Sequence, residues 1–229
     1  MTIRAVAHGF AQSGNATSVV ATVDTSGCSG LVVGVVDIST TSSTLVDLGS
    51  NIWTPLTAQP LGSAQRTQLY FCANPIVGSG HTFIVTSNSG NSFPSVAIEG
   101  FSGTGALSPF DIENGSATIG SFTSSQPGSV SPTVDGELII TFIGNANATT
   151  VATPDLGFTR TDGAVTSAGL AYGFAMAYLI QTTKGAVNPT WSWTANDDKN
   201  SVIACFKAQP ENFLVNVRKS QAIKRPSVY

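Results

Sequence analysis

Charged side chains are scarce in this sequence. Lys, Arg, Asp and Glu together make up 10% of the 229 residues, whereas soluble globular proteins usually carry about 25%. The polar residues are mainly Ser, Thr, Asn and Gly instead. Because 41% of the residues are hydrophobic, the chain can bury a substantial core, which excludes a disordered protein.

Targeting and membrane signals are also missing. The first residues, MTIRAVAHGF, lack a basic segment followed by an apolar one, so we expect no secretory signal. The longest apolar stretch, GLAYGFAMAYLI, is shorter than the roughly 20 residues that a membrane-spanning helix needs. We therefore expect a protein that is made in a cytoplasm and has no membrane partner.

Cysteine is rare, and its pattern excludes a disulfide framework. Cys28, Cys72 and Cys205 are odd in number and have no CxxC spacing. Each lies among apolar or small residues, which favours buried free thiols over a metal or redox role.

The motifs of common enzymes are absent. The nearest approach to a nucleophile elbow, GFSGT at residues 100–104, has the wrong spacing. GSGHTF and GTGALS lack the third glycine of a dinucleotide-binding loop. His8 and His81 are the only imidazole bases, and we expect both to be ordinary surface or strand-end residues. The sequence therefore favours a protein that is not an enzyme.

The acidic residues allow a weaker alternative, a glycan hydrolase. Such enzymes need two carboxylates across a cleft. Asp135 and Glu137 are two residues apart, but TVDGEL is typical of a turn that enters a strand, with both acids solvated. Glu99 lies inside an apolar run, and a buried acid needs a partner.

Metals and cofactors are not expected. TANDDKNS contains Asn196, Asp197, Asp198 and Asn200, whose oxygens could hold calcium. The spacing of a calcium loop is missing, and a tight turn would use the same residues, so a turn is favoured.

Short β-branched and apolar runs dominate the sequence. TSVVATV, GLVVGVVDI, TQLYFCA, HTFIVTS, SVAIEGF, ELIITFI, PTWSWTA and SVIACFK are separated by turn residues. This pattern predicts many short antiparallel strands in a sandwich or barrel. The ambiguous segment 169–183 is rich in aromatic residues, so we expect a strand there too.

The two halves of the chain share an order of features at an offset near 106 residues. Leu31 corresponds to Leu138, Tyr70 to Tyr178, and SVAIEGF to SVIACFK. The correspondence predicts two pseudo-repeated halves. We expect an antiparallel β-sandwich of jelly-roll type in one domain, residues 1–208, with two tandem sandwiches as the alternative.

Tryptophans could bind carbohydrate. Trp191 and Trp193 point to the same face of a predicted strand, and Trp53 lies in the matching place of the first half. An exposed face would be a glycan platform, whereas a face turned to the other sheet would be core. Core is favoured, because Trp commonly fills sandwich interiors.

The last 21 residues differ from the rest. Residues 1–208 carry 6 Lys and Arg against 12 Asp and Glu, whereas residues 209–229 carry 4 against 1. This extended C-terminal arm combines an apolar stretch with cations, which suits binding to an acidic protein surface better than binding to nucleic acid. The expected partner-binding residues are Phe213, Leu214, Val217, Arg218, Lys219, Lys224, Arg225 and Tyr229.

The series GLVVGVV, IWTPL, LYFCANPIVGSGHTFIVT and VAIEGFSG followed by SPFD resembles β-sandwich modules of bacteriophage virion proteins and of some bacterial surface proteins. The resemblance covers about residues 1–208 and departs where Asn51 and Ile52, not Gly, precede Trp53. It transfers no catalytic residue. It implies a virion or surface role, such as that of a capsid decoration protein, head fibre or tail adhesin, and a homo-oligomer such as a trimer.

Together these features predict a non-enzymatic virion structural protein. We expect a capsid decoration protein that the basic and apolar arm anchors to the major capsid protein or a neighbouring structural protein. The alternative is a carbohydrate-binding adhesin that uses Trp53, Trp191 and Trp193.

Overall fold

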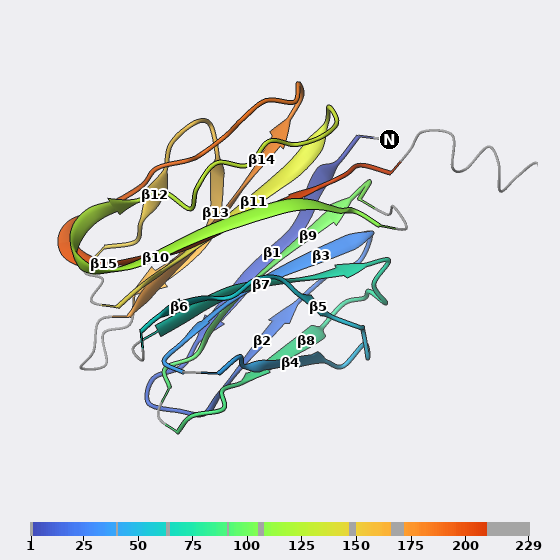
Figure 1. Ribbon diagram of the computed structural model, residues 1–229. Coiled ribbons are helices and arrows are strands. Elements are labelled where there is room, and N and C mark those ends of the chain that lie inside the picture. The colour runs from blue at the N-terminus through green and yellow to red at the C-terminus, as the bar shows by residue number, and fades with distance from the viewer. Residues whose placement is uncertain are drawn as a thin grey trace, which may run out of the picture.

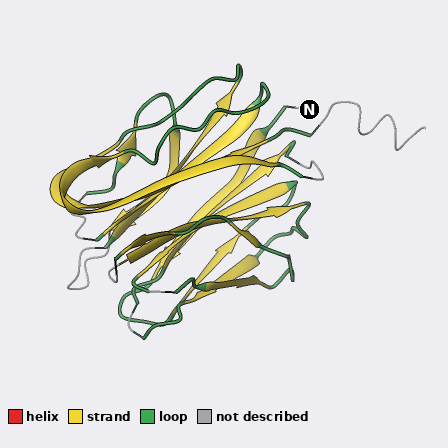
Figure 2. Ribbon diagram, viewed as in Figure 1, coloured by secondary structure: helices red, strands yellow, loops and turns green. Residues whose placement is uncertain are grey.

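The computed structural model describes residues 2–39, 41–62, 65–90, 92–104, 108–146, 150–165 and 172–209. Within these ranges the regular elements are strands, and Figure 2 shows no helix among them. The described part of the chain accordingly offers no long apolar helix that could cross a membrane. The strand pairs are antiparallel, so the predicted all-β antiparallel sandwich is confirmed.

The first half of the chain contains the following strands: β1 (Arg4–Gln12), β2 (Ser18–Val23), β3 (Gly30–Asp37), β4 (Thr44–Asp47), β5 (Thr54–Pro55), β6 (Gln59–Leu61), β7 (Gln65–Ala73), β8 (His81–Thr86) and β9 (Ser95–Ser102). The second half contains β10 (Phe110–Ser125), β11 (Glu137–Asn145), β12 (Thr153–Pro154), β13 (Thr159–Val165), β14 (Gly173–Gln181) and β15 (Trp191–Phe206). The ambiguous apolar segment is therefore a strand, as predicted.

Strands of the first half form two sheets. The larger sheet has the order β1-β9-β3-β7-β5, with β6 also paired to β7, and the smaller has the order β2-β8-β4. Burial alternates along β2, in the sequence SVVATV, because one side of the small sheet is exposed. All eight residues of β3 are buried, because its sheet is covered on both faces.

The second half repeats this order with longer strands. Its large sheet has the order β10-β15-β11-β14-β13. The pairing of β10 with β15 is irregular near Phe122. Beyond this region the last residues of β10 pair with the first residues of β15, and β12 pairs with the same residues of β15. In Figure 1, β10 and β15 bend together at one end of the molecule. Each of them therefore occupies the positions that two separate strands occupy in the first half.

The ladders of the two halves also share a register. Tyr70 pairs with Val33 in the first half, and Tyr178 pairs with Ile140 in the second. With Val33 matched to Ile140, Leu31 and Leu138 also correspond, as the sequence offset predicts. The pseudo-repeat is therefore present in both strand order and pairing.

Each half is a sandwich with its own core, and the two sandwiches pack through their large sheets. Figure 1 shows the resulting layers, with the small sheet β2-β8-β4 at one outer side. The core of the first half includes Val33, Phe83 and Ile98, and that of the second includes Ile139 and Trp191. The specific jelly-roll type is not confirmed, and it stays a prediction.

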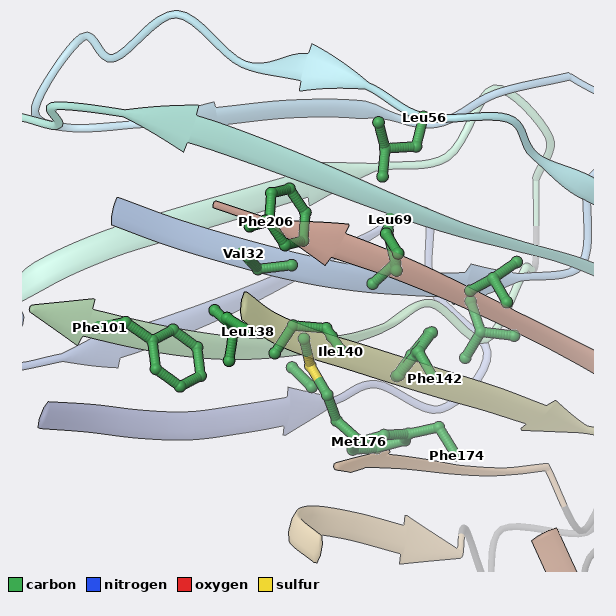
Figure 3. Packing of buried hydrophobic residues seen from close by; sticks show 14 of the residues in the cluster. Val32, Leu56, Leu69, Phe101, Leu138, Ile140, Phe142, Phe174, Met176 and Phe206 are labelled. Atoms are coloured by element: carbon green, nitrogen blue, oxygen red, sulfur yellow. The ribbon is translucent and has the colours of Figure 1, made fainter. Parts of the chain in front are cut away.

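A third core lies between the two large sheets and joins the halves. Val32, Leu69 and Phe101 of the first half meet Phe142 and Phe206 of the second, as Figure 3 shows. Burial of apolar surface from both halves in this shared core stabilises their packing. We call the contact between the two large sheets the seam.

Gly34 marks a close approach across the seam. A Cβ atom at Gly34 would lie 2.7 Å from the ring of Phe142. A residue without a side chain is therefore needed in the middle of β3, where the ring of the other half lies against the backbone.

Contacts across the seam are reciprocal. Strand β1 of the first half lies against β13 of the second, and β10 of the second lies against β6 of the first. β1 and β10 hold the same place in their sheets, as do β6 and part of β13. Such exchange of equivalent contacts is the relation that a two-fold axis produces between subunits.

Candidate functional site

The predicted arm lies outside the described residues. The candidate residues Phe213, Leu214, Val217, Arg218, Lys219, Lys224, Arg225 and Tyr229 all fall in 210–229. The structure does describe the point at which this segment begins.

That point, which we call the arm root, is fixed by three contacts. The backbone N–H of Lys207 donates to Pro109 O at 2.7 Å, and that of Gln209 donates to Gly103 O at 2.7 Å. Lys207 Nζ lies 2.7 Å from Asp111 Oδ1. The end of β15 is therefore tied to the chain that leads into β10.

Two carboxyl groups meet at the arm root. Asp111 also accepts hydrogen bonds from the N–H and the hydroxyl of Thr133, at 2.8 and 2.9 Å. Burial opposes ionisation of Asp111, but hydrogen bonds from Lys207 and Thr133 outweigh it and lower the pKa of this carboxyl. Burial, together with the nearby charge of Asp111, raises the pKa of Glu137. The pair therefore favours one negative charge beside Lys207.

The position of Glu137 corrects the expectation that both acids of TVDGEL are solvated. Glu137 is fully buried and accepts from the N–H of Val134 at 2.9 Å. Asp135 is exposed and accepts from the N–H of Lys184 at 2.7 Å. The sequence could not separate them, because the two acids are only two residues apart and their burial is set by the packing of the fold. The two acids do not form a cleft for a hydrolase.

A second polar cluster closes one edge of the seam. Glu99 on β9 accepts a hydrogen bond from the hydroxyl of Thr161 on β13. His8 Nδ1 on β1 lies 3.1 Å from Asp162 Oδ1, also on β13. Both contacts join one half to the other, and we call these four residues the seam cluster.

Burial raises the pKa values of the two carboxyl groups in the seam cluster. Desolvation raises the pKa of Glu99 to about 8, against a lowering by Thr161 and a further raising by the charge of Asp162. Desolvation also raises the pKa of Asp162, although His8 counters it. Glu99 lines a cavity of about 100 Å³ together with His8 and Tyr178. The partner that a buried Glu99 requires is therefore Thr161, which no local sequence signal could reveal because it lies 62 residues away.

His81, predicted to lie at a strand end, is the first residue of β8, but it is buried rather than exposed. Its Nδ1 lies 2.9 Å from Thr25 Oγ1 and its Nε2 lies 3.4 Å from Asp47 Oδ1. This order of groups is the order of a catalytic triad. Thr25, however, is fully buried and its hydroxyl also accepts from the N–H of Gly78 at 3.1 Å. The chain of contacts holds the loop before β8 and exposes no nucleophile.

Two of the three tryptophans are core residues. Trp191 has no exposed surface, and its Nε1 donates to Thr141 Oγ1 at 3.0 Å. Trp193 is 7% exposed and belongs to the same core. Trp53 is half-buried and donates to Asp47 Oδ2 at 2.7 Å. Trp191 and Trp193 therefore offer no free ring face to a sugar, and the core interpretation applies to them.

The remaining candidates are structural. Asn196, Asp197, Asp198 and Asn200 lie within strand β15, which corrects the prediction of a tight turn. Among the described residues, no group of three His, Cys, Asp or Glu side chains could hold a metal ion. Cys28, Cys72 and Cys205 are buried and free, as predicted.

A polar groove on the second half has no signal in the sequence, because its lining comes from segments that are distant in the chain. It has a volume of about 560 Å³ and lies beside the bend of β10 and β15.

Comparisons of the chain with protein-family models, with curated proteins and with solved structures gave no match.

Proposed function

We propose that the chain is a structural protein of a bacteriophage particle, a capsid decoration protein that residues 209–229 attach to the particle. The partner is the major capsid protein or a neighbouring structural protein. The arm root carries this proposal: β15 pairs with β10 and β11 inside its sheet and ends at Phe206, and the backbone hydrogen bonds of Lys207 and Gln209 fix the point at which the arm begins.

Charge supports an acidic partner. The arm from residue 209 carries 4 Lys and Arg against 1 Asp or Glu, whereas residues 1–208 carry 6 against 12. An acidic lattice would attract the arm and repel the body, which favours attachment through the arm with the body displayed outward. Lys207 and Asp111 give the arm a fixed origin on the body.

Self-association of the chain belongs to the same proposal. Val20 and Val46 are 54% and 48% exposed and flank Ile84 in register on the outer face of β2-β8-β4. This uncharged row supports packing of copies around a common axis.

Removal of the arm tests the proposal. The full chain and a 1–209 variant are each mixed with phage particles that lack this protein, and the particles are then sedimented. We expect the full chain to sediment with the particles and the 1–209 variant to stay in solution, with the same thermal unfolding midpoint. Attachment of the full chain should weaken as salt is raised, because exposed charges are screened over about 10 Å at 0.1 M.

Three results would contradict it. If the 1–209 variant unfolds, residues 210–229 are part of the fold. If both chains sediment, attachment runs through the body. If neither sediments, the chain is not a decoration protein of those particles.

A further inference from the structure

The polar groove on the second half has the size and the lining of a binding site. Asn114, Ser116 and Ser124 of β10 line one part of it, and Asn188 and Thr190, which precede β15, line another. The loop at Gln126–Gly128 and Lys199 of β15 also line the groove. Its volume of about 560 Å³ is in the range of small-molecule sites.

Several hydrogen bonds hold the walls of the groove. Asn114 Nδ2 donates to Ser129 O at 3.0 Å, and the N–H of Gly128 donates to Asn188 Oδ1 at 3.1 Å. Gln126 Nε2 donates to Thr190 Oγ1 at 3.1 Å. Gly128 has a φ of 101°, and a Cβ there would lie 2.6 Å from Asn114 Nδ2. The walls are therefore fixed before any ligand arrives, which reduces the entropy lost on binding.

The chemistry of the lining matches a polyhydroxylated ligand. Ser and Thr hydroxyls and Asn and Gln amides each both donate and accept hydrogen bonds. A sugar hydroxyl needs both kinds of partner. Among the described lining residues, Lys199 alone carries a charge, so nothing in the lining repels a neutral or an acidic sugar.

A comparison between the two halves shows that this polarity is particular to the second. In the first half, Val20 and Val46 flank Ile84 across the small sheet. At the corresponding ladder positions of the second half, Ser124 and Thr153 flank Ser192. The same fold therefore presents an aliphatic row on one half and a hydroxyl row on the other, beside the groove. Packing does not require this change, because Ser124, Ser192 and Thr153 are exposed.

From this geometry we infer that the groove at Ser116, Ser124, Asn188 and Lys199 binds carbohydrate, as a short oligosaccharide lying along the hydroxyl row of the second half. The site is separate from Trp191 and Trp193, which are buried in the core. It needs neither the arm nor the attachment of the chain to a particle.

Lys199 sets the preference of the site among sugars. Its Nζ lies 4.5 Å from the centroid of the Phe122 ring, which holds the ammonium group near the groove. A uronic acid carboxylate can pair with this cation, whereas a neutral sugar gains only hydrogen bonds. Acidic oligosaccharides should therefore bind more tightly than neutral ones.

Saturation-transfer NMR on the full chain tests the inference. The probes are maltose, cellobiose and diacetylchitobiose as neutral sugars, and digalacturonate as the acidic one. At about 5 mM, a site with a Kd near 1 mM is mostly filled. We expect transfer to at least one probe and a lower Kd for digalacturonate than for the neutral sugars that bind.

Matched variants locate the site. Ser124→Trp fills the groove from an exposed position, and should weaken binding at least about tenfold, a loss of roughly 1.4 kcal/mol. Thr22→Trp places the same bulk at another exposed position of the first half, on β2, and should leave binding unchanged. Lys199→Gln should remove the preference for digalacturonate and keep binding of neutral sugars.

Two outcomes overturn the inference. The first is no transfer to any probe by the unmodified chain. The second is binding that Ser124→Trp does not weaken, or that Thr22→Trp weakens equally. Circular dichroism of each variant shows whether the fold is kept, and Lys199→Gln provides an independent test if Ser124→Trp does not fold.

Discussion

Phe83 and Trp191 occupy the same position in the two halves of the protein. Phe83 pairs with Ala21 and Asp47 at the centre of its small sheet, and Trp191 pairs with Ser125 and Pro154 at the matching point. Both side chains have no exposed surface. A tryptophan that suggested a glycan platform in the sequence is therefore the counterpart of an ordinary core phenylalanine.

Truncation of Trp191 should destabilise the second half strongly. Trp191→Ala leaves a large cavity in the core of the second half and removes the hydrogen bond to Thr141. We therefore expect a loss of about 3–5 kcal/mol in the free energy of unfolding. Urea denaturation measures this loss. Trp191→Phe restores the residue found in the first half and should cost less, and an equal cost for both variants would contradict the equivalence of the two positions.

Gly34→Ala should weaken the seam. The added Cβ would lie 2.7 Å from the Phe142 ring, and overpacking of this kind usually costs about 1–3 kcal/mol. Gly78→Ala is the control, since a Cβ at Gly78 meets nothing within 4 Å. Thermal and urea unfolding should show a clear loss for the first variant and little for the second. Equal stabilities would mean that the seam relaxes at no cost.

Stability should fall as pH rises from about 5 to about 8. Burial raises the pKa of Glu99 from 4.5 to about 8 in the folded chain, so the folded state holds a proton that the unfolded state has already released. Proton uptake on folding then costs at most about 1.4 kcal/mol for each pH unit in that window. Below pH 4.5 both states are protonated and the contribution is fully present, and above pH 8 it is lost.

Glu99→Gln should flatten this pH dependence. Urea denaturation at pH 5, 6.5 and 8, values that lie inside the window set by the shifted pKa, compares the variant with the unmodified chain. Asp135→Asn, at an exposed turn, should keep the original slope. An unchanged slope in Glu99→Gln would show that another group controls the dependence.

Loss of Asp111 should loosen the arm root. Asp111→Asn removes the ion pair with Lys207 at 2.7 Å and weakens the two hydrogen bonds from Thr133. We expect a lower thermal unfolding midpoint and faster hydrogen exchange at the end of β15. Because hydrogen bonds lower the pKa of Asp111, the difference from the unmodified chain should shrink as pH falls and this carboxyl is protonated. A constant difference would argue against the charge of Asp111.

The three thiols should resist modification in the folded protein. Cys28, Cys72 and Cys205 are buried, and burial raises the pKa of Cys205 to about 12 and that of the other two to about 11. A thiol-reactive dye should label none of them at neutral pH until urea unfolds the chain, and then all 3. Rapid labelling of the native protein would show local opening.

Sequence patterns predicted the strands because these depend on local periodicity, and the repeat because matching features follow in the same order in both halves. The runs around Val33 and Ile140 are apolar whichever sheet covers them. The same patterns left open whether the halves share one sandwich, because they indicate that a face is buried but not what buries it. The positions of the seam and of the core in each half could therefore be assigned only from the structure.

The polar clusters could not be predicted, because their members are far apart in the chain. Glu99 and Thr161 are separated by 62 residues, and His8 and Asp162 by 154. Glu99 signalled only that it needed a partner. The polar TANDDKNS segment suggested a turn, since the sequence gives no sign that β10 and β15 continue through a bend as paired strands.

The reciprocal seam makes the chain a tethered dimer of half-chains. Each half carries both β-strand surfaces that the contact requires, and one crossing between β9 and β10 connects them. A covalent link of this kind replaces encounter of two molecules by an effective local concentration in the millimolar range. The fused protein thus keeps its halves together at any dilution, whereas the same halves produced as separate chains would associate only above a threshold concentration.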